Sequence, residues 1–416
     1  MSQFPSGIGR QDFLDRVAEL EHLSNFATIE QNLFDEGPHL VASPELPWGD
    51  EARHFSVETY SRFIHGETWT TGDGALAMQD EIVSWMGGIL GAAAPTGFVT
   101  SGGSESNMCA LLTAKSRAGR SGSVVFPAYS HYSFYKACKM FDLEAIAVEP
   151  VAGTRCEIDP DAIEAAIRDD TIAIVATAGT WAYGSVDPVG AIGKIATDHG
   201  VYLHVDACFG GYILPFLERS GYDTTIEPWD FRVEAVCSIS ADLHKNGMAP
   251  PPASTLFFRD ASYLEAAKAI CPPNGTISGT RGTGPIAGAW AMVKLLGEEG
   301  YVATSLKSMH LRQQLFDGIT SIEGLNIVPG SKINVSLLYS DVLDLRPVVR
   351  AMRQRGWMFS SRDTPAPIAI VLVPMPQNEC RINGFLADLA DAVSLAPPLR
   401  PSEDGTGQTD QTSYGI

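Results

Sequence analysis

Two polar side chains follow apolar stretches that are typical of buried strands, and their chemistry is complementary. Lys245 comes shortly after the apolar run 235–239, and Asp206 ends the mostly apolar run 201–205. In an open α/β sheet the carboxyl ends of neighbouring strands meet at one edge, which is the usual position of reactive groups. A single lysine after a strand is most often a solvated surface charge. A role in chemistry is favoured here because Lys245 occurs together with Asp206.

This pair predicts a cofactor that carries both a carbonyl group and a basic ring nitrogen. A lysine amine can bind a carbonyl compound covalently. A carboxylate at the end of a buried strand needs a cationic partner, and a protonated pyridine nitrogen is such a partner. Lys245 and Asp206 together therefore predict pyridoxal 5'-phosphate chemistry.

A glycine-rich segment predicts where the phosphate of this cofactor would bind. Residues 101–107 read Ser-Gly-Gly-Ser-Glu-Ser-Asn and precede an apolar helical pattern that runs to Leu112. The first N–H groups of a helix attract an anion, although an ordinary helix cap is the more common explanation of such a segment. Beside Lys245 and Asp206, a phosphate cradle formed by Gly103 and Ser104 is favoured.

Five motifs occur in the order seen in group II pyridoxal-phosphate-dependent decarboxylases, and the chain resembles that family. They are Ser-Gly-Gly-Ser-Glu-Ser (101–106), His-Tyr-Ser-Phe-Tyr-Lys-Ala (131–137), Thr-Ala-Gly-Thr-Trp-Ala-Tyr-Gly-Ser-Val-Asp-Pro (177–188), His-Val-Asp-Ala-Cys-Phe-Gly-Gly (204–211) and Asp-Leu-His-Lys (242–245). The proline-rich segment 249–253 and Gly-Thr-Arg-Gly at 279–282 are similar to archaeal tyrosine and aspartate decarboxylases. His-Val-Asp-Ala-Cys is also similar to sphingosine-phosphate lyases, which share the fold and the cofactor.

The resemblance implies roles for further residues. His131 would stack on the pyridine ring and reach the substrate carboxylate, and Thr177 or Thr180 would bond the phenolic oxygen of the cofactor. Gly279 and Thr280 would contact the phosphate bound to a neighbouring subunit, which implies a homodimer with shared active sites. The matching motifs imply cofactor contacts from three more residues: Cys208, Asp242 and His244.

The expected reaction is decarboxylation of an L-amino acid, which releases CO2 and an amine, and several alternatives remain. Residues 266–284 lack the tyrosine that such decarboxylases commonly carry, which leaves room for oxidative deamination. A carbon–carbon lyase is the main alternative, but residues 249–253 lack the second lysine of those enzymes. A non-catalytic cofactor-binding protein is a remote alternative. Arg281 and the 60s segment are candidates for substrate contact, and the amino acid itself is left open.

Alternating strands and helices predict an α/β fold with a mainly parallel sheet and helices on both faces. The resemblance implies the aspartate aminotransferase-like fold type I of pyridoxal-phosphate enzymes. We expect an N-terminal segment (1–73) whose helix at 11–35 clasps a second subunit, a large cofactor-binding domain (74–319), a small C-terminal α/β domain (320–395) and a disordered tail (396–416). We expect 47–73 to be a long loop, which either partly lines the pocket or is an ordinary surface loop.

Composition narrows the possible partners and locations. The 416 residues are 45% hydrophobic, as in a globular protein, and contain no apolar run long enough to span a bilayer. A formal charge of −20 argues against nucleic acid. The seven cysteines lack Cys-x-x-Cys spacing, which predicts reduced thiols without a zinc site. Together with the absence of a signal-like N-terminus, these features predict a cytoplasmic enzyme that acts on a small molecule, with no metal and no membrane contact.

Overall fold

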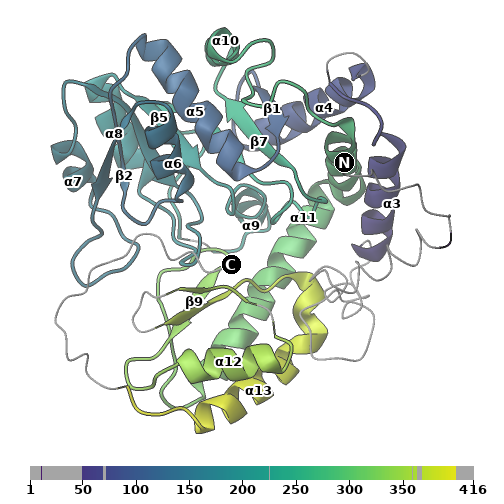
Figure 1. Ribbon diagram of the computed structural model, residues 1–416, viewed down its shortest axis with the longest axis vertical. Helices are drawn as coiled ribbons and strands as arrows, with labels where there is room; N and C mark the ends of the chain where they lie inside the picture. The colour runs from purple at the N-terminus through teal and green to yellow at the C-terminus, as the bar shows by residue number, and fades with distance from the viewer. Residues whose placement is uncertain are drawn as a thin grey trace, which may run out of the picture.

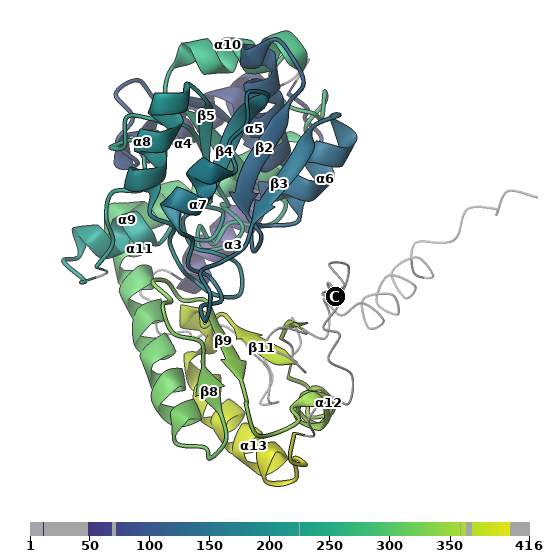
Figure 2. The same ribbon diagram turned by 90° about the vertical axis from the view of Figure 1, so that its left-hand side faces the viewer.

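A computed structural model describes residues 11, 49–68, 72–223, 225–357, 359–362 and 368–399. The expected dimer-clasping helix at 11–35 lies outside the described residues, except for residue 11, and so do residues 400–416 of the expected tail. Figures 1 and 2 show a larger part built around one sheet, a long helix that leads out of it, and a smaller part around the far half of that helix.

Seven strands form the sheet of the larger part, in the order β1-β7-β6-β5-β4-β2-β3. Strands β3, β2, β4, β5 and β6 are parallel, whereas β7 runs antiparallel to both β6 and β1. The predicted mainly parallel sheet is therefore confirmed. The strands are β1 (Thr96–Thr100), β2 (Ser123–Pro127), β3 (Glu144–Val148), β4 (Thr171–Thr177), β5 (Tyr202–Asp206), β6 (Val236–Ala241) and β7 (Ser254–Phe258).

Helices cover both faces of this sheet, as alternate residues of β2 show. Val124 and Phe126 pack in one apolar cluster with Phe134, and Val125 packs in another with Ile192. Strands covered on both faces have near-continuous apolar sequences, which is why the short apolar runs predict them well. The helices are α4 (Asp73–Ile89), α5 (Gly103–Ala118), α6 (Ser133–Met140), α7 (Pro160–Ala165), α8 (Val189–His199), α9 (Leu214–Arg219) and α10 (Ala261–Ile270).

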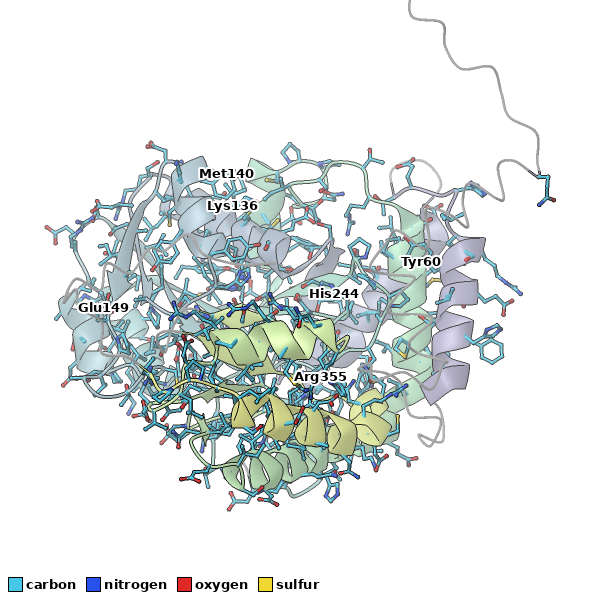
Figure 3. All side chains as sticks on the ribbon, turned by 60° about the horizontal axis from the view of Figure 1, so that its bottom comes forward. Tyr60, Lys136, Met140, Glu149, His244 and Arg355 are labelled. Carbon is cyan, nitrogen blue, oxygen red and sulfur yellow. The ribbon has the colours of Figure 1, made fainter. Side chains whose placement is uncertain are left out.

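The expectation of a loop over residues 47–73 is wrong, because residues 49–62 form helix α3 (Gly49–Arg62). It packs along α11 (Thr283–Thr320), the long helix of Figures 1 and 2, and Figure 3 labels Tyr60 between the two. A Cβ added at Gly284 or Gly288 would lie 3.1 or 3.2 Å from the Tyr60 side chain, so the glycines permit this close approach. Packing against α11 stabilises a segment that has no clear apolar period of its own.

The smaller part has its own antiparallel sheet, in the order β10-β11-β9-β8. Its core includes Leu311 of α11, Leu338, Val348, Trp357 and Phe385. The predicted domain limits stay a prediction: α11 ends at Thr320, at the expected boundary, but Leu311 before it already packs in the core of the smaller part. No helix in the described ranges is long and apolar enough to cross a bilayer. The elements are β8 (Asn326–Ile327), β9 (Ser336–Tyr339), α12 (Arg346–Gln354), β10 (Ser361–Arg362), β11 (Ala369–Leu372), the 3-10 helix η1 (Pro376–Arg381) and α13 (Ile382–Ser394).

Candidate active site

The carboxyl ends of β4, β5 and β6 form one wall of a cavity of about 350 Å³. Thr177 pairs with Asp206 across β4 and β5, and Asp206 pairs with Ser240 across β5 and β6. In Figure 3 His244, one of the lining residues, lies near the centre of the view, above Arg355 of the smaller part. Of the twelve predicted site residues, ten line this cavity: Gly103, Ser104, His131, Thr177, Thr180, Asp206, Cys208, Asp242, His244 and Lys245.

Lys245 lies on the turn that follows β6, and its ammonium is held by a carboxylate and an aromatic ring. Its Nζ is 2.7 Å from Oδ2 of Asp242 and 4.2 Å from the ring centroid of Phe209. The turn is fixed by Asn246, whose amide donates to the Phe209 carbonyl at 2.7 Å. Burial has the largest single effect and would lower the pKa of Lys245. The charge and hydrogen bond of Asp242, together with Cys208 and Asp206, outweigh burial, so the pKa lies above its ordinary value. The amine must therefore lose a proton before it can act as a nucleophile.

Asp206 ends β5 with both carboxylate oxygens bonded. The Cys208 backbone N–H donates to Oδ1 at 3.0 Å, and the Asn107 side-chain amide donates to Oδ2 at 2.9 Å. Burial has the largest single effect and would raise the pKa of Asp206. His131, the backbone and side chain of Cys208, and Lys245 together outweigh burial, so the pKa lies below its ordinary value. An ionised, oriented carboxylate at this depth fits a protonated pyridine nitrogen.

The N-terminus of α5 faces the same cavity. Gly102 precedes the helix with φ 151°, and no side chain caps the first turn. A Cβ added at Gly103 would lie 2.5 Å from Cys208 Sγ and 2.8 Å from Asp242 Oδ1, so only glycine fits where the helix begins. Uncapped N–H groups and the positive end of the helix dipole attract an anion.

The cavity also contains a buried hydroxyl that lacks a partner. Thr177 Oγ1 makes no hydrogen bond within the described part of the chain, although Thr177 is only 4% exposed. A buried hydroxyl without a partner is costly, and a bound acceptor oxygen would satisfy it. This hydroxyl, the α5 N-terminus, the Asp206 carboxylate and the Lys245 amine are together the groups that pyridoxal 5'-phosphate requires.

His131 lies just before α6 and lines the cavity. Its Nδ1 is 2.9 Å from the hydroxyl of Ser133 and 3.3 Å from the Ser133 backbone nitrogen. Burial holds the pKa of His131 below its ordinary value despite the opposing charge of Asp206. The imidazole is therefore neutral over a wider range of acidic pH than a free histidine.

Several residues near the cavity were not predicted from the sequence. Asn107 and Ser240 contact Asp206 from behind, and Glu105 accepts hydrogen bonds from the Ser101 backbone and hydroxyl, both at 2.7 Å. Two features of the sequence could have indicated Asn107 and Ser240. Asn107 lies one helical turn after Gly103, and Ser240 is one of two serines at alternate positions in the buried strand β6.

Arg281, a candidate for substrate contact, has a structural position in its own chain. The residue is 8% exposed and does not line the cavity. Its guanidinium donates to the side chain of Gln79 at 2.8 Å and to the carbonyl of Val99. Its own carbonyl accepts the Thr68 backbone N–H, so Arg281 joins the 60s segment to the body of the protein. None of the described residues 60–68 lines the cavity.

Gly279 and Thr280, the remaining two predicted site residues, lie away from the cavity of their own chain and are exposed. Their segment is joined to the start of α5, because the Ser278 backbone N–H donates to Oε1 of Glu105 at 3.0 Å. Their predicted contact with a neighbouring subunit stays a prediction.

Comparison with known proteins agrees with this geometry. Residues 65–338 match the family model described as the pyridoxal-dependent decarboxylase conserved domain. A probable L-tyrosine/L-aspartate decarboxylase of Methanothrix thermoacetophila is 33% identical over 346 residues, which cover 81% of this chain and 87% of the relative. An L-aspartate/L-glutamate decarboxylase of Pyrococcus horikoshii is 32% identical over 382 residues, which cover 89% of this chain and 96% of the relative.

Solved structures share the fold over almost the whole chain. The sphingosine-1-phosphate lyase Bpss2021 of Burkholderia pseudomallei K96243 superposes with a TM-score of 0.82 at 28% identity, covering 95% of this chain and 93% of the lyase. A Lactobacillus brevis glutamate decarboxylase superposes with a TM-score of 0.76 at 19% identity, covering 95% and 94%, which is a likeness of fold. By its matching domain and these relatives, the chain belongs to the pyridoxal-dependent decarboxylase family and is a pyridoxal-phosphate-dependent amino-acid decarboxylase.

Proposed function

We propose that the chain removes the α-carboxylate of an L-amino acid in the cavity beside Lys245, releasing CO2 and an amine. The observation that carries this proposal is that Lys245, Asp206 and His131 line one cavity although they come from three separate segments. Family membership supplies the reaction class, and the cavity supplies residues suited to each part of it.

Five residues are proposed to hold the cofactor. When bound, pyridoxal 5'-phosphate supplies an electron sink for the pair released as the bond between Cα and the carboxylate breaks. Lys245 holds the cofactor covalently through Nζ, and Asp206 keeps the ring nitrogen protonated. Gly103 and Ser104 bind the phosphate with the first N–H groups of α5, and the unpaired hydroxyl of Thr177 binds the phenolic oxygen.

His131 is proposed to cover one face of the cofactor ring and to orient the substrate carboxylate. A proton must also be delivered to Cα to complete the amine. Lys245 and His131 are candidate donors for this step, since both line the cavity and both carry exchangeable protons.

The substrate is proposed to be an acidic or aromatic L-amino acid. The names of the relatives include tyrosine, aspartate and glutamate as substrates. In this chain the cavity wall includes the stacked rings of Trp181 and Phe209, with centroids 4.9 Å apart, and three basic side chains, Lys245, His131 and His244. L-Aspartate, L-glutamate and L-tyrosine are therefore the first amino acids to test.

The working enzyme is proposed to be a cytoplasmic homodimer. Gly279 and Thr280 are exposed and outside their own cavity, which suits a contact with the phosphate in the partner subunit. All seven cysteines are free thiols, as expected in a reducing compartment. Residues 11–35 would add a second contact between the subunits.

A carbon–carbon lyase is the second candidate, and one observation favours it. The superposition with a sphingosine-1-phosphate lyase has a higher TM-score, 0.82, than the 0.76 of the glutamate decarboxylase. Decarboxylation remains the better supported proposal, because three curated relatives with 30% identity or more over most of the chain are named decarboxylases.

A single assay separates these reactions. Purified enzyme loaded with pyridoxal 5'-phosphate is incubated with the three amino acids and with a phosphorylated amino alcohol, and CO2, amine and aldehyde are followed by mass spectrometry. Amine with CO2 supports the proposal and identifies the substrate. Aldehyde without CO2 would overturn it in favour of the lyase, and cofactor binding without any product would indicate a non-catalytic protein. Lys245→Ala is the matched control and should yield no product.

A further inference from the structure

A buried hydrogen-bond network behind the cavity wall joins the Asp206 carboxylate to the His131 imidazole. Asn107 of α5 is at its centre and is 1% exposed. The Asn107 Nδ2 donates to Asp206 Oδ2 at 2.9 Å and to the hydroxyl of Ser133 at 3.1 Å. The Ser133 hydroxyl in turn lies 2.9 Å from Nδ1 of His131. Two residues with proposed cofactor roles are thus linked through Asn107 and Ser133, which were not among the predicted site residues.

The orientation of the Asn107 amide is fixed from both ends. Asp206 is ionised and can only accept, so the nitrogen of the amide must face it. At the other end, Oδ1 of Asn107 lies 2.8 Å from the Ser240 hydroxyl and 3.1 Å from His204 Nε2, both of which can donate. Burial lowers the pKa of His204 to about 4, so its ring is neutral. Its single proton lies on Nε2, because this nitrogen faces the Asn107 Oδ1 acceptor. His204 Nδ1 is then the acceptor for the Ser238 hydroxyl at 2.8 Å.

The contacts of Ser133 determine which nitrogen of His131 carries the proton. The Ser133 oxygen accepts from Asn107, which leaves its own proton able to reach His131 Nδ1, 2.9 Å away. The backbone N–H of Ser133 donates to the same nitrogen at 3.3 Å. A neutral imidazole with two donors directed at Nδ1 carries its own proton on Nε2.

We propose that Asn107 is a positioning residue that acts through Ser133 to hold the proton of neutral His131 on Nε2, so that His131 offers the cavity a hydrogen-bond donor. This inference deepens the proposed function and rests on it for its meaning in catalysis. A donor at Nε2 suits an anionic substrate carboxylate, whereas an unprotonated Nε2 would repel it. The same network keeps the Asp206 carboxylate oriented. The Asn107 amide therefore fixes both the orientation of Asp206 and the tautomer of His131.

Charged groups around His131 come from three sides. Asp206 ends β5, Asp242 and Lys245 follow β6, and Arg362 belongs to β10 of the smaller part. The two carboxylates favour the imidazolium, and the two cations and burial oppose it. Because the balance keeps the pKa of His131 below its ordinary value, the imidazole is neutral near neutral pH, and its tautomer decides which nitrogen carries the proton.

Nitrogen NMR on the protein without cofactor tests the inference directly. The nine histidines are labelled with 15N, and the His131 signals are identified by their loss in His131→Gln. In the wild type, we expect Nδ1 to resonate as an unprotonated acceptor nitrogen and Nε2 as a protonated nitrogen. A proton found on Nδ1 would overturn the inference without any further variant.

Two serine variants then test the relay. Ser133→Ala removes the hydroxyl that bonds His131, and we expect the ratio of the Nδ1-protonated to the Nε2-protonated form to rise roughly three- to tenfold, since one neutral hydrogen bond is lost. Ser240→Ala removes a hydroxyl of the same size from the acceptor side of Asn107, where His204 still fixes the amide, and should leave the ratio unchanged. An unchanged ratio in Ser133→Ala, or an equal change in both variants, would overturn the relay.

The loaded enzyme provides a second readout. Loss of the Ser133 hydroxyl removes a bond that only neutral His131 accepts, so the pKa of His131 should rise and the acidic limb of the kcat/KM profile should move to higher pH in Ser133→Ala. An acidic limb that stays at its wild-type pH in Ser133→Ala would overturn the relay. If no amino acid is decarboxylated, the proposed function fails while the NMR result stands. If the tautomer is wrong but amine is formed, only this inference fails.

Discussion

Thr177 and Asp206 stand opposite each other at the last residues of β4 and β5, yet only Asp206 has its side chain satisfied. The backbone of Thr177 is nevertheless fixed on both sides by Asp187. The Thr177 N–H donates to Asp187 Oδ2 at 2.7 Å, and the Asp187 N–H donates to the Thr177 carbonyl at 2.9 Å. The unpaired Thr177 hydroxyl is therefore held in position by a carboxyl group outside the cavity lining.

The first prediction concerns the ionisation of Asp187. Burial raises the pKa of Asp187 to about 7, although the Tyr129 hydroxyl donates to it at 2.7 Å. The folded state therefore binds an extra proton between the ordinary aspartate pKa and pH 7. Stability should fall as pH rises through this window, by about 1.4 kcal/mol for each pH unit in which the two states differ by one proton.

An Asp187→Asn variant isolates this effect, because asparagine has nearly the same shape and cannot ionise. Urea unfolding of wild type and variant is compared between pH 4 and 8. We expect the free energy of unfolding of the wild type to decline relative to the variant as pH rises, and the difference to be constant above pH 7. A difference that is independent of pH would contradict the raised pKa.

The second prediction concerns the charge of Asp206. Asp206→Asn keeps the size of the side chain and removes the anion that would keep a pyridine nitrogen protonated. We expect kcat to fall roughly 10²–10³-fold, the scale at which one preorganised electrostatic contact contributes to a transition state. Steady-state kinetics on the loaded variant measure the loss. Asp198→Asn on the exposed side of α8 is the control, and a wild-type kcat in Asp206→Asn would contradict the assigned role.

The sequence predicts those parts of the site that depend on local pattern. Lys245, Asp206 and Thr177 follow short apolar runs, and parallel strands bring their ends to one edge of the sheet. Asn107 could not be predicted in the same way, because its role comes from contacts with Ser133 and Asp206, which are 26 and 99 residues away. Helix α3 was missed for a similar reason: it is stabilised by the glycine face of α11, more than two hundred residues later.

The third prediction concerns the start of α5. Gly103→Ala would bring a methyl group within 2.5 Å of Cys208 Sγ and 2.8 Å of Asp242 Oδ1. Such overpacking typically costs about 1–3 kcal/mol, and moving the first turn of α5 should also weaken binding of pyridoxal 5'-phosphate. Thermal unfolding and a fluorescence titration with the cofactor measure the two effects.

Gly88→Ala is the matched control for Gly103→Ala, because it also replaces a glycine in a helix. Gly88 is exposed in α4, and no atom lies within 4 Å of an added Cβ. Alanine there should leave cofactor affinity unchanged and raise stability by about 0.5–1 kcal/mol. Equal cofactor affinity in the two variants would mean that the α5 N-terminus does not bind the phosphate.

The fourth prediction concerns active sites shared between subunits. If Thr280 serves the cavity of the partner, Thr280→Glu sets a negative charge against the phosphate bound there and should strongly reduce activity. Lys245→Ala should abolish activity by removing the covalent anchor. In a mixed dimer one cavity combines the Lys245 of the Thr280→Glu subunit with the Thr280 of the Lys245→Ala subunit, so that cavity is intact.

Mixed dimers are obtained by co-expressing the two variants with different affinity tags, and light scattering should give a mass twice the 44.6 kDa of the chain. We expect about half of the wild-type activity per dimer, because one of its two cavities is restored while the other carries both defects. Co-expressed Thr280→Glu chains with the same two tags are the control. Mixed dimers no more active than this control would mean that Thr280 acts on its own cavity or on none, since the restored activity can arise only if each subunit supplies a residue to the other.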